Sequence, residues 1–189
     1  MVLDHAVCVR SYPGSPRGGD MGLVVPLAQG ALAVLLDASG HGLDAYAVAQ
    51  KARRTILSNS HLAPANLLLA LNDALQSSIG AAAAVASLQD EQLAFSGIGN
   101  VNARLIVASH QQALKVKTGV LGLRMRTPET QTLPFPIGAC LVMHSDGVAL
   151  LDHVPRGNAQ AIAQSLVEQL GSPHDDASAL VLQRLGRVL

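Results

Sequence analysis

The sequence predicts a layered α+β fold in which β-sheets are covered by helices. Strand-like apolar runs come first, two segments of helical periodicity follow, and then come further strands, one helix and a last strand. Most neighbouring strand-like runs are separated by short turns, which favours antiparallel pairing. At 189 residues, of which 49% are hydrophobic, we expect one domain over residues 1–189 that buries a substantial core.

The sequence predicts three strands before His41, the histidine that lies between two glycines. Residues 4–12 alternate loosely between apolar and polar, which predicts a strand, and the Pro- and Gly-rich residues 13–20 end it. The apolar runs 21–27 and 31–37 are separated by Ala-Gln-Gly, which is typical of a hairpin turn.

Three segments have the spacing of amphipathic helices. Residues 43–60 carry apolar side chains at helical intervals, with basic residues on the other face. A second helix is predicted over 64–78, because Pro64 suits the first turn of a helix. The third is predicted over 158–171, with Gly171 as its C-cap.

The middle of the chain changes to strand periodicity. Residues 81–109 predict three strands of an antiparallel meander, with "QDEQ" between the first two and "GIGN" before the third. Further strands are predicted at 113–119, 130–135, 139–146 and 178–185.

Composition excludes several classes of function. Thirteen basic residues balance thirteen acidic ones, so we expect no nucleic-acid partner. Every apolar run is interrupted before the 18 or more residues that a membrane span needs, so no membrane association is expected. The N-terminal residues do not resemble a signal peptide, which predicts a cytoplasmic protein. Cys8 and Cys140 lack metal-binding or redox spacing and are predicted to be buried thiols.

Acidic residues stand at the ends of several predicted strands. Asp20 ends "RGGD", Asp37 ends "LAVLLD", Asp146 ends "CLVMHSD", and Asp175 and Asp176 precede "ASALVL". Aspartate is common in turns, so each of these acids alone could serve only its turn. Clustered carboxylates repel one another unless a cation neutralises them, and oxygen ligands favour Mg²⁺ or Mn²⁺.

The motifs "GGD", "DASGHG", "SDGV" and "DDAS" occur in this order between residues 18 and 178. Together they resemble the PPM (PP2C-like) metal-dependent serine/threonine phosphatases, and in particular the bacterial sporulation and stress-response branch with its stressosome phosphatases. The resemblance implies a four-layer αββα sandwich of two antiparallel sheets flanked by helices. It also implies hydrolysis of phosphoserine or phosphothreonine on STAS-domain stressosome proteins, of the RsbS and RsbR type, by water activated at a binuclear Mn²⁺ or Mg²⁺ centre.

The same resemblance assigns roles to the acids. Asp37 would bridge two metal ions, and the backbone carbonyl of Ala38 would serve the second of them. Asp146 and Asp175 would complete the ligands of the first metal, and Asp20 would hold water or metal on the other side. Asp37 and Asp146 are therefore the expected catalytic residues.

Two residues have weaker assignments. His41 could protonate the leaving serine oxygen, but it stands four residues after Asp37, and ordering of the glycine loop is an equally simple role. Arg17 could bind the substrate phosphate in bidentate fashion, or it could be a solvated loop arginine.

Two alternatives stay open. His144 and His174 lie within two residues of proposed ligands, so a zinc site is conceivable. The chain could also be a catalytically weak or inactive PP2C-like module that binds a phosphoprotein partner, although all the acidic motifs are retained.

Overall fold

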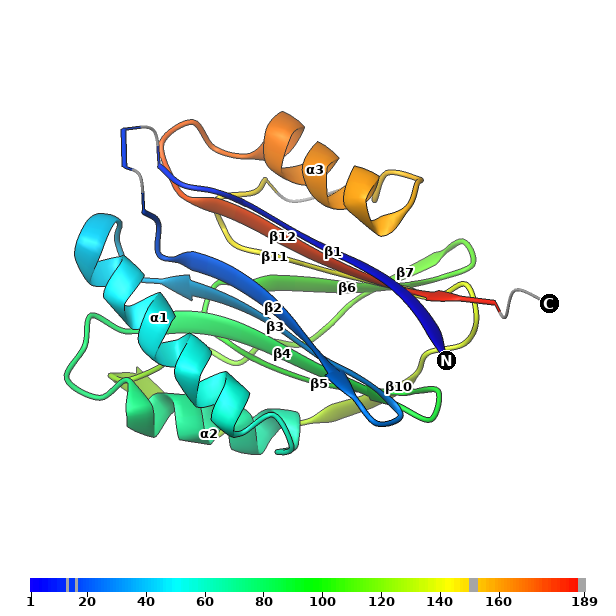
Figure 1. Cartoon of the computed structure of the whole chain (residues 1–189), viewed down its shortest axis with the longest axis horizontal. Helices are drawn as coiled ribbons and strands as arrows, with labels where there is room; N and C mark the ends of the chain where they lie inside the picture. The colour runs from blue at the N-terminus through cyan, green and yellow to red at the C-terminus, as the bar shows by residue number, and fades with distance from the viewer. Residues whose placement is uncertain (13, 16, 150–152, 187–189) are drawn as a thin grey trace.

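The protein is a sandwich of two antiparallel five-stranded sheets with helices on both outer faces (Figure 1). The computed structural model describes residues 1–12, 14–15, 17–149 and 153–186. Pro13 and Pro16, from the predicted turn segment 13–20, and residues 187–189 of the predicted domain lie outside the described residues. The predicted four-layer αββα arrangement is confirmed.

The two sheets draw their strands from both halves of the chain. In spatial order, the first sheet contains β1 (Val2–Arg10), β12 (Ala177–Leu185), β11 (Cys140–His144), β6 (Asn102–Val107) and β7 (His110–Ala113). The second contains β10 (Gln131–Pro134), β5 (Gln92–Ile98), β4 (Ala81–Gln89), β3 (Gly30–Ala38) and β2 (Asp20–Leu27). A short ribbon of β8 (Gly119–Val120) and β9 (Arg124–Met125) pairs separately.

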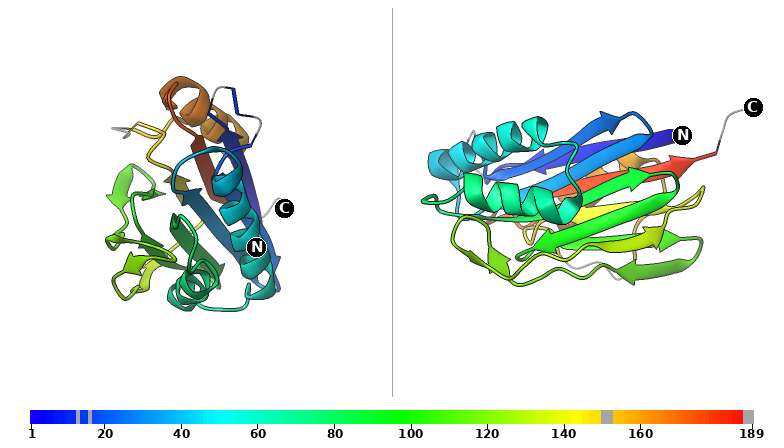
Figure 2. Two further views of the ribbon diagram at one scale, coloured as in Figure 1. Left: turned by 90° about the vertical axis from the view of Figure 1, so that its left-hand side faces the viewer. Right: turned by 90° about the horizontal axis from the view of Figure 1, so that it is seen from below.

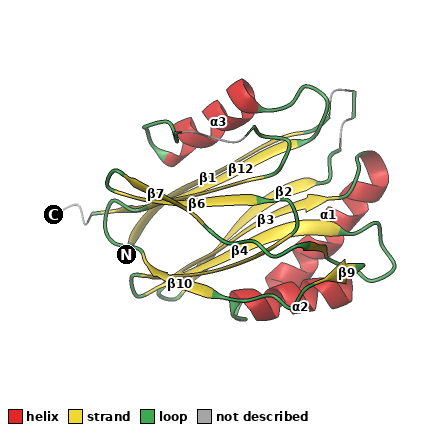
Figure 3. Cartoon of the chain, turned by 180° about the vertical axis from the view of Figure 1, so that it is seen from behind, coloured by secondary structure: helices red, strands yellow, loops and turns green. Residues whose placement is uncertain are grey.

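The helices cover the outer faces of the sheets (Figures 2 and 3). α1 (Gly42–Ser58) and α2 (Pro64–Ala74) lie on the second sheet, and α3 (Ala159–Leu170) lies on the first. α3 begins where predicted, because the Asn158 side chain accepts a hydrogen bond from the backbone of Ala161. None of the described helices has the combination of length and apolar character needed to cross a membrane.

The central strands are buried on both faces, which explains why they are continuous apolar runs. In β3, Leu32, Val34 and Leu36 pack toward the helices, whereas Ala33 and Leu35 pack between the sheets. This run ends at Leu36, and the next residue, Asp37, is partly exposed at one end of the sandwich.

The predicted meander is only partly correct. β4 and β5 form the expected hairpin, but β6 belongs to the other sheet. "GIGN" therefore ends β5 at Ile98, and residues 99–101 connect the two sheets instead of forming a hairpin turn. The sequence pattern could not reveal this, because a crossover and a tight turn both use small residues.

Two elements differ from prediction by more than a shift of one or two residues. The strand predicted over 113–119 is irregular after Ala113, although the Lys117 amide donates to the Gly97 carbonyl and so keeps the segment beside β5. α2 ends at Ala74 rather than at residue 78, because Ser77 has a left-handed φ of 63° that no continuing helix allows. Cys140 is buried as predicted, whereas Cys8 is only partly buried.

Candidate metal centre

Three of the predicted acids line one cleft at an end of the sandwich. The cleft has a volume of about 410 Å³, and Asp37, Asp146 and Asp175 all contribute to its wall. Asp37 stands near the end of β3, while Asp146 follows β11 and Asp175 precedes β12. β11 and β12 are antiparallel neighbours, so the end of one and the start of the other meet at the same edge. The remaining cleft residues are Ser39, Gly40, Ala82, Gly99, Asn100, Thr118, Gly119 and Val120.

Asp20 lies next to this cleft, opposite Asp37. The two aspartates are directly paired across the β2–β3 ladder, a position where like charges destabilise a sheet. Asp20 is 7% exposed, and its Oδ2 atom is buried without a hydrogen-bond partner. A buried carboxylate oxygen without a partner costs free energy unless a cation or water satisfies it.

The crowding of these carboxylates shifts their pKa values upward. Burial, followed by the neighbouring charges of Asp20 and Asp146, raises the pKa of Asp37 to about 9. Burial also raises the pKa of Asp20 to about 6, although the hydroxyls of Ser178 and Ser145 oppose the change. Ionising both Asp20 and Asp37 is therefore unfavourable in the metal-free protein, and a divalent cation would relieve the repulsion between them. The donor set of carboxylate oxygens fits Mg²⁺ or Mn²⁺.

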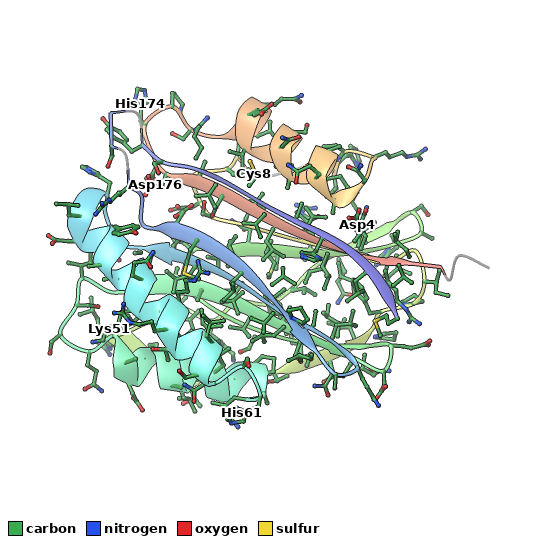
Figure 4. All side chains as sticks on the ribbon, viewed as in Figure 1. Asp4, Cys8, Lys51, His61, His174 and Asp176 are labelled. Atoms are coloured by element: carbon green, nitrogen blue, oxygen red, sulfur yellow. The ribbon has the colours of Figure 1, made fainter. Side chains whose placement is uncertain are left out.

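Asp176 holds the backbone around the acidic cluster. Its Oδ1 accepts the Tyr12 amide at 2.6 Å, and its Oδ2 accepts the Gly19 amide, also at 2.6 Å. Asp176 is 4% exposed and sits at the end of the sandwich near the start of α1 (Figure 4). Because Gly19 precedes Asp20 and Asp176 follows Asp175, this one carboxylate fixes the two chain segments that carry those acids.

Backbone geometry explains the glycines in the motifs "SDGV" and "DASGHG". A Cβ on Gly147 would lie 1.8 Å from the Asp176 carbonyl oxygen, so only glycine allows the turn after Asp146 to pack here. Gly40 has a left-handed φ of 76°, with open space around it, so its conformation rather than close packing requires glycine.

The structure places His41 and Arg17 outside the residues that line the cleft. The His41 ring stacks on Tyr12, with ring centroids 5.1 Å apart. The Arg17 guanidinium lies over the Tyr46 ring at 5.0 Å. His41 is also the N-cap residue of α1, but its side chain makes no capping hydrogen bond. Both side chains are thus occupied by aromatic neighbours at the side of the cleft.

Ala38 and Asn100 lie beside the acids, one as a buried backbone position and the other as a hydrogen-bond donor. Ala38 is buried and is not among the described cleft-lining residues; its carbonyl faces Gly19, where a Cβ would come within 3.0 Å of the oxygen. No motif in the sequence points to Asn100, whose Nδ2 donates a hydrogen bond to Oδ2 of Asp146. Asn100 reaches Asp146 only because "GIGN" crosses between the sheets.

The geometry gives no support to a zinc site. His144 is 1% exposed, its Nδ1 lies 2.9 Å from the Ser145 carbonyl, and burial lowers its pKa. Neither His144 nor His174 lines the cleft. Within the described ranges, no three His, Cys, Asp or Glu side chains converge into a ready-made metal cage. The acidic residues instead share an open cleft.

Comparison with known proteins identifies the class to which this fold and acidic cleft belong. The chain is a protein serine/threonine phosphatase domain of the PP2C (PPM) type. Residues 28–185 match the family model of stage II sporulation protein E (SpoIIE), so the chain belongs to the SpoIIE family. Among curated proteins, no sequence relative matches.

Solved structures share the fold over nearly the whole chain. A protein from work on the bacterial stressosome, a modular system adapted to control secondary messenger signalling, is 21% identical with a TM-score of 0.90, covering 97% of this chain and 100% of that one. RsbX in complex with magnesium is 20% identical with a TM-score of 0.85, covering 96% and 94%. The catalytic domain of the phosphatase PstP, in complex with two manganese ions, is 14% identical with a TM-score of 0.76, covering 98% and 100%.

Asp37→Asn should stabilise the metal-free protein in a pH-dependent way. Because the folded-state pKa of Asp37 is raised to about 9, the wild type is most stable when this carboxyl is protonated and loses stability as the pH rises from about 4 toward 9. Asparagine carries no charge, so the gain in the free energy of unfolding should be largest at pH 8 and shrink toward pH 4. Urea unfolding in EDTA measures it, with the exposed Asp73→Asn as control; an equal gain at every pH would contradict the assignment.

Asp176→Ala should lower the free energy of unfolding by roughly 1–3 kcal/mol, because the amides of Tyr12 and Gly19 lose their acceptor. Asp176→Asn keeps one acceptor oxygen and should lose less. Thermal or urea unfolding compares both with Asp73→Ala, an exposed aspartate substitution. If Asp176→Ala were as stable as that control, these hydrogen bonds would not hold the segments together.

Proposed function

We propose that the protein removes phosphate from phosphoserine or phosphothreonine on STAS-domain proteins of a stressosome, using two Mn²⁺ or Mg²⁺ ions. The observation that carries this proposal is the crowding of Asp20, Asp37 and Asp146 at one end of the sandwich, with raised pKa values at Asp37 and Asp20. Such crowding is unfavourable in a protein without a cationic ligand. It is the arrangement expected where cations are part of the working site.

The acids divide naturally between two ions. Asp37 is close to both Asp20 and Asp146, so it would help to hold both ions. Asp146 and Asp175 would complete one side, and Asp20 with the Ala38 carbonyl would complete the other. Divalent ions held there would neutralise phosphoryl oxygens and lower the pKa of a bound water, which supplies the nucleophile.

The other residues of the site orient the acidic side chains or keep the cleft open to substrate. The hydrogen bond from Asn100 fixes the carboxylate of Asp146, and Asp176 fixes the backbone beside Asp20 and Asp175. Such outer contacts keep ligand carboxylates in one orientation. Ser39, Gly40 and Gly99 are small, so the cleft stays open enough for a phosphorylated side chain to enter.

The choice of substrate and metals is supported by the structural neighbours. One comes from work on the stressosome, another is RsbX with magnesium, and a third holds two manganese ions. A cytoplasmic setting and a single working domain over residues 1–189 belong to the same proposal. The alternative of an inactive binding module is disfavoured, because all the acidic motifs are present and three of the acids line one cleft.

Asp37→Asn and Asp146→Asn should each lower metal-dependent turnover of p-nitrophenyl phosphate by roughly a hundredfold or more, because each removes a ligand charge. EDTA should stop the wild-type reaction, and excess Mn²⁺ or Mg²⁺ should restore it. Asp73→Asn, on the exposed face of α2, should be as active as wild type. The apo protein should stay folded by circular dichroism, since its core does not depend on the ions. Full activity in either cleft variant would refute the site.

His41→Ala should slow p-nitrophenyl phosphate and a phosphoserine peptide to a similar extent. The ring stacks on Tyr12 outside the cleft lining, so its loss should loosen the turn after Asp37 and weaken metal affinity, which excess Mn²⁺ would partly offset. A general acid would behave differently: its loss would slow the serine substrate by about a hundredfold or more and the good leaving group much less. Steady-state kinetics on both substrates at two Mn²⁺ concentrations distinguish these roles.

A further inference from the structure

The segment next to the cleft is unusually basic for this chain. Residues 92–128 contain no Asp or Glu, although the whole protein has equal numbers of acidic and basic residues. The cations of this segment are Arg104, Lys115, Lys117, Arg124 and Arg126. Of these, Lys117 is paired with Glu129 at 2.8 Å, while within the described ranges Arg104, Arg124 and Arg126 form no ion pair. Positive charge is thus concentrated on one stretch and is not neutralised there.

The β8–β9 ribbon presents two of these arginines on a fixed surface. Leu121 is fully buried in its turn and exchanges backbone hydrogen bonds with Ala81 of β4. The Gly122 amide donates to Asn72 of α2 at 3.1 Å, which ties the ribbon to the helix layer. The ribbon is therefore held by contacts at both the sheet and the helix.

Strand periodicity places the arginines on the outer face of the ribbon. Met125 packs into the core between the second sheet and its helices. Arg124 and Arg126 flank it in the sequence and so point to the opposite side, where both are exposed. Arg126 directly follows β9, and its amide donates to the Thr118 carbonyl, so the extended pairing continues to this residue. Two guanidinium groups on the same side of this short segment can each bind a carboxylate in bidentate fashion.

This basic surface continues directly from the acidic cleft. Thr118 and Gly119 line the cleft and also line the hollow that contains Arg124 and Arg126. Gly99 and Asn100 also line both the cleft and a hollow that contains Arg104. The cleft that the carboxylates line therefore adjoins two hollows that contain arginines.

We propose that the outer face of the β8–β9 ribbon, formed by Arg124 and Arg126, docks acidic residues that flank the phosphorylated residue of a protein substrate. The inference rests on the proposed phosphatase function and adds the chemistry of the substrate sequence. A peptide whose phosphoserine enters the cleft and whose chain runs over Thr118 and Gly119 would bring its neighbouring residues to these arginines. Unpaired exposed arginines beside the site attract such a chain over a longer range than contacts alone.

Two phosphoserine peptides of equal length, one with three glutamates and one with three lysines on each side, test this surface. Wild type should have the higher kcat/KM on the glutamate peptide, and added salt should reduce the difference. In Arg124→Glu/Arg126→Glu, kcat/KM on the glutamate peptide should fall roughly tenfold while that on the lysine peptide rises. Arg53→Glu/Arg54→Glu, two exposed arginines on α1, is the matched control and should keep the wild-type preference.

Binding of a fluorescein-labelled glutamate peptide without phosphate gives a readout that does not depend on catalysis. Its anisotropy should show weaker binding to Arg124→Glu/Arg126→Glu than to wild type and the control. Equal kcat/KM of the wild type on the two peptides would contradict the docking surface but not the phosphatase function. A preference for the glutamate peptide that Arg124→Glu/Arg126→Glu leaves unchanged would do the same. Tighter binding of a labelled oligothymidylate than of the glutamate peptide would overturn it as well. Absence of any metal-dependent turnover of p-nitrophenyl phosphate would instead contradict the phosphatase proposal.

Discussion

The repulsion between Asp20 and Asp37 is the constraint around which this end of the molecule is organised. The two carboxylates face each other across adjacent antiparallel strands, and Asp146 approaches from the other sheet. A sheet would not ordinarily place like charges in this register, because each lowers the stability of the other. At this site, bound cations would neutralise the carboxylates, and the same arrangement of charges would then be favourable. The apolar sandwich behind it supplies the stability that the site itself does not.

Much of the surrounding structure serves to keep these acids in place. Asp176 bonds the backbone beside Asp20, and Asn100 bonds Asp146. Gly147 leaves room for the Asp176 carbonyl, so the loops after β11 and before β12 can pack against each other. A buried hydrogen-bonded carboxylate orders backbone well because both of its oxygens are occupied and its charge is shared with donors. The site is thus open toward solvent but rigid at its base.

Charge is distributed unevenly around this opening. Asp37, Asp146 and Asp175 line the cleft, whereas Arg124 and Arg126 line the adjoining hollow beside the ribbon. Separation of this kind lets one surface hold cations and another attract an anionic chain, although the protein as a whole carries no net charge. The β8–β9 ribbon is small, yet its attachment to β4 and α2 gives it a defined position beside the cleft.

The sequence by itself determined the layered fold and the acids at the strand ends. Apolar runs such as 31–36 must be buried on both faces, and an aspartate that ends such a run must emerge at the edge of a sheet. The tertiary structure alone decided which edges meet. It moved β6 into the other sheet, brought Asn100 to Asp146, and turned His41 and Arg17 toward tyrosines rather than into the cleft. The physical reason is that periodicity reports which face of an element is buried, whereas contacts between residues far apart in the chain depend on how the layers pack.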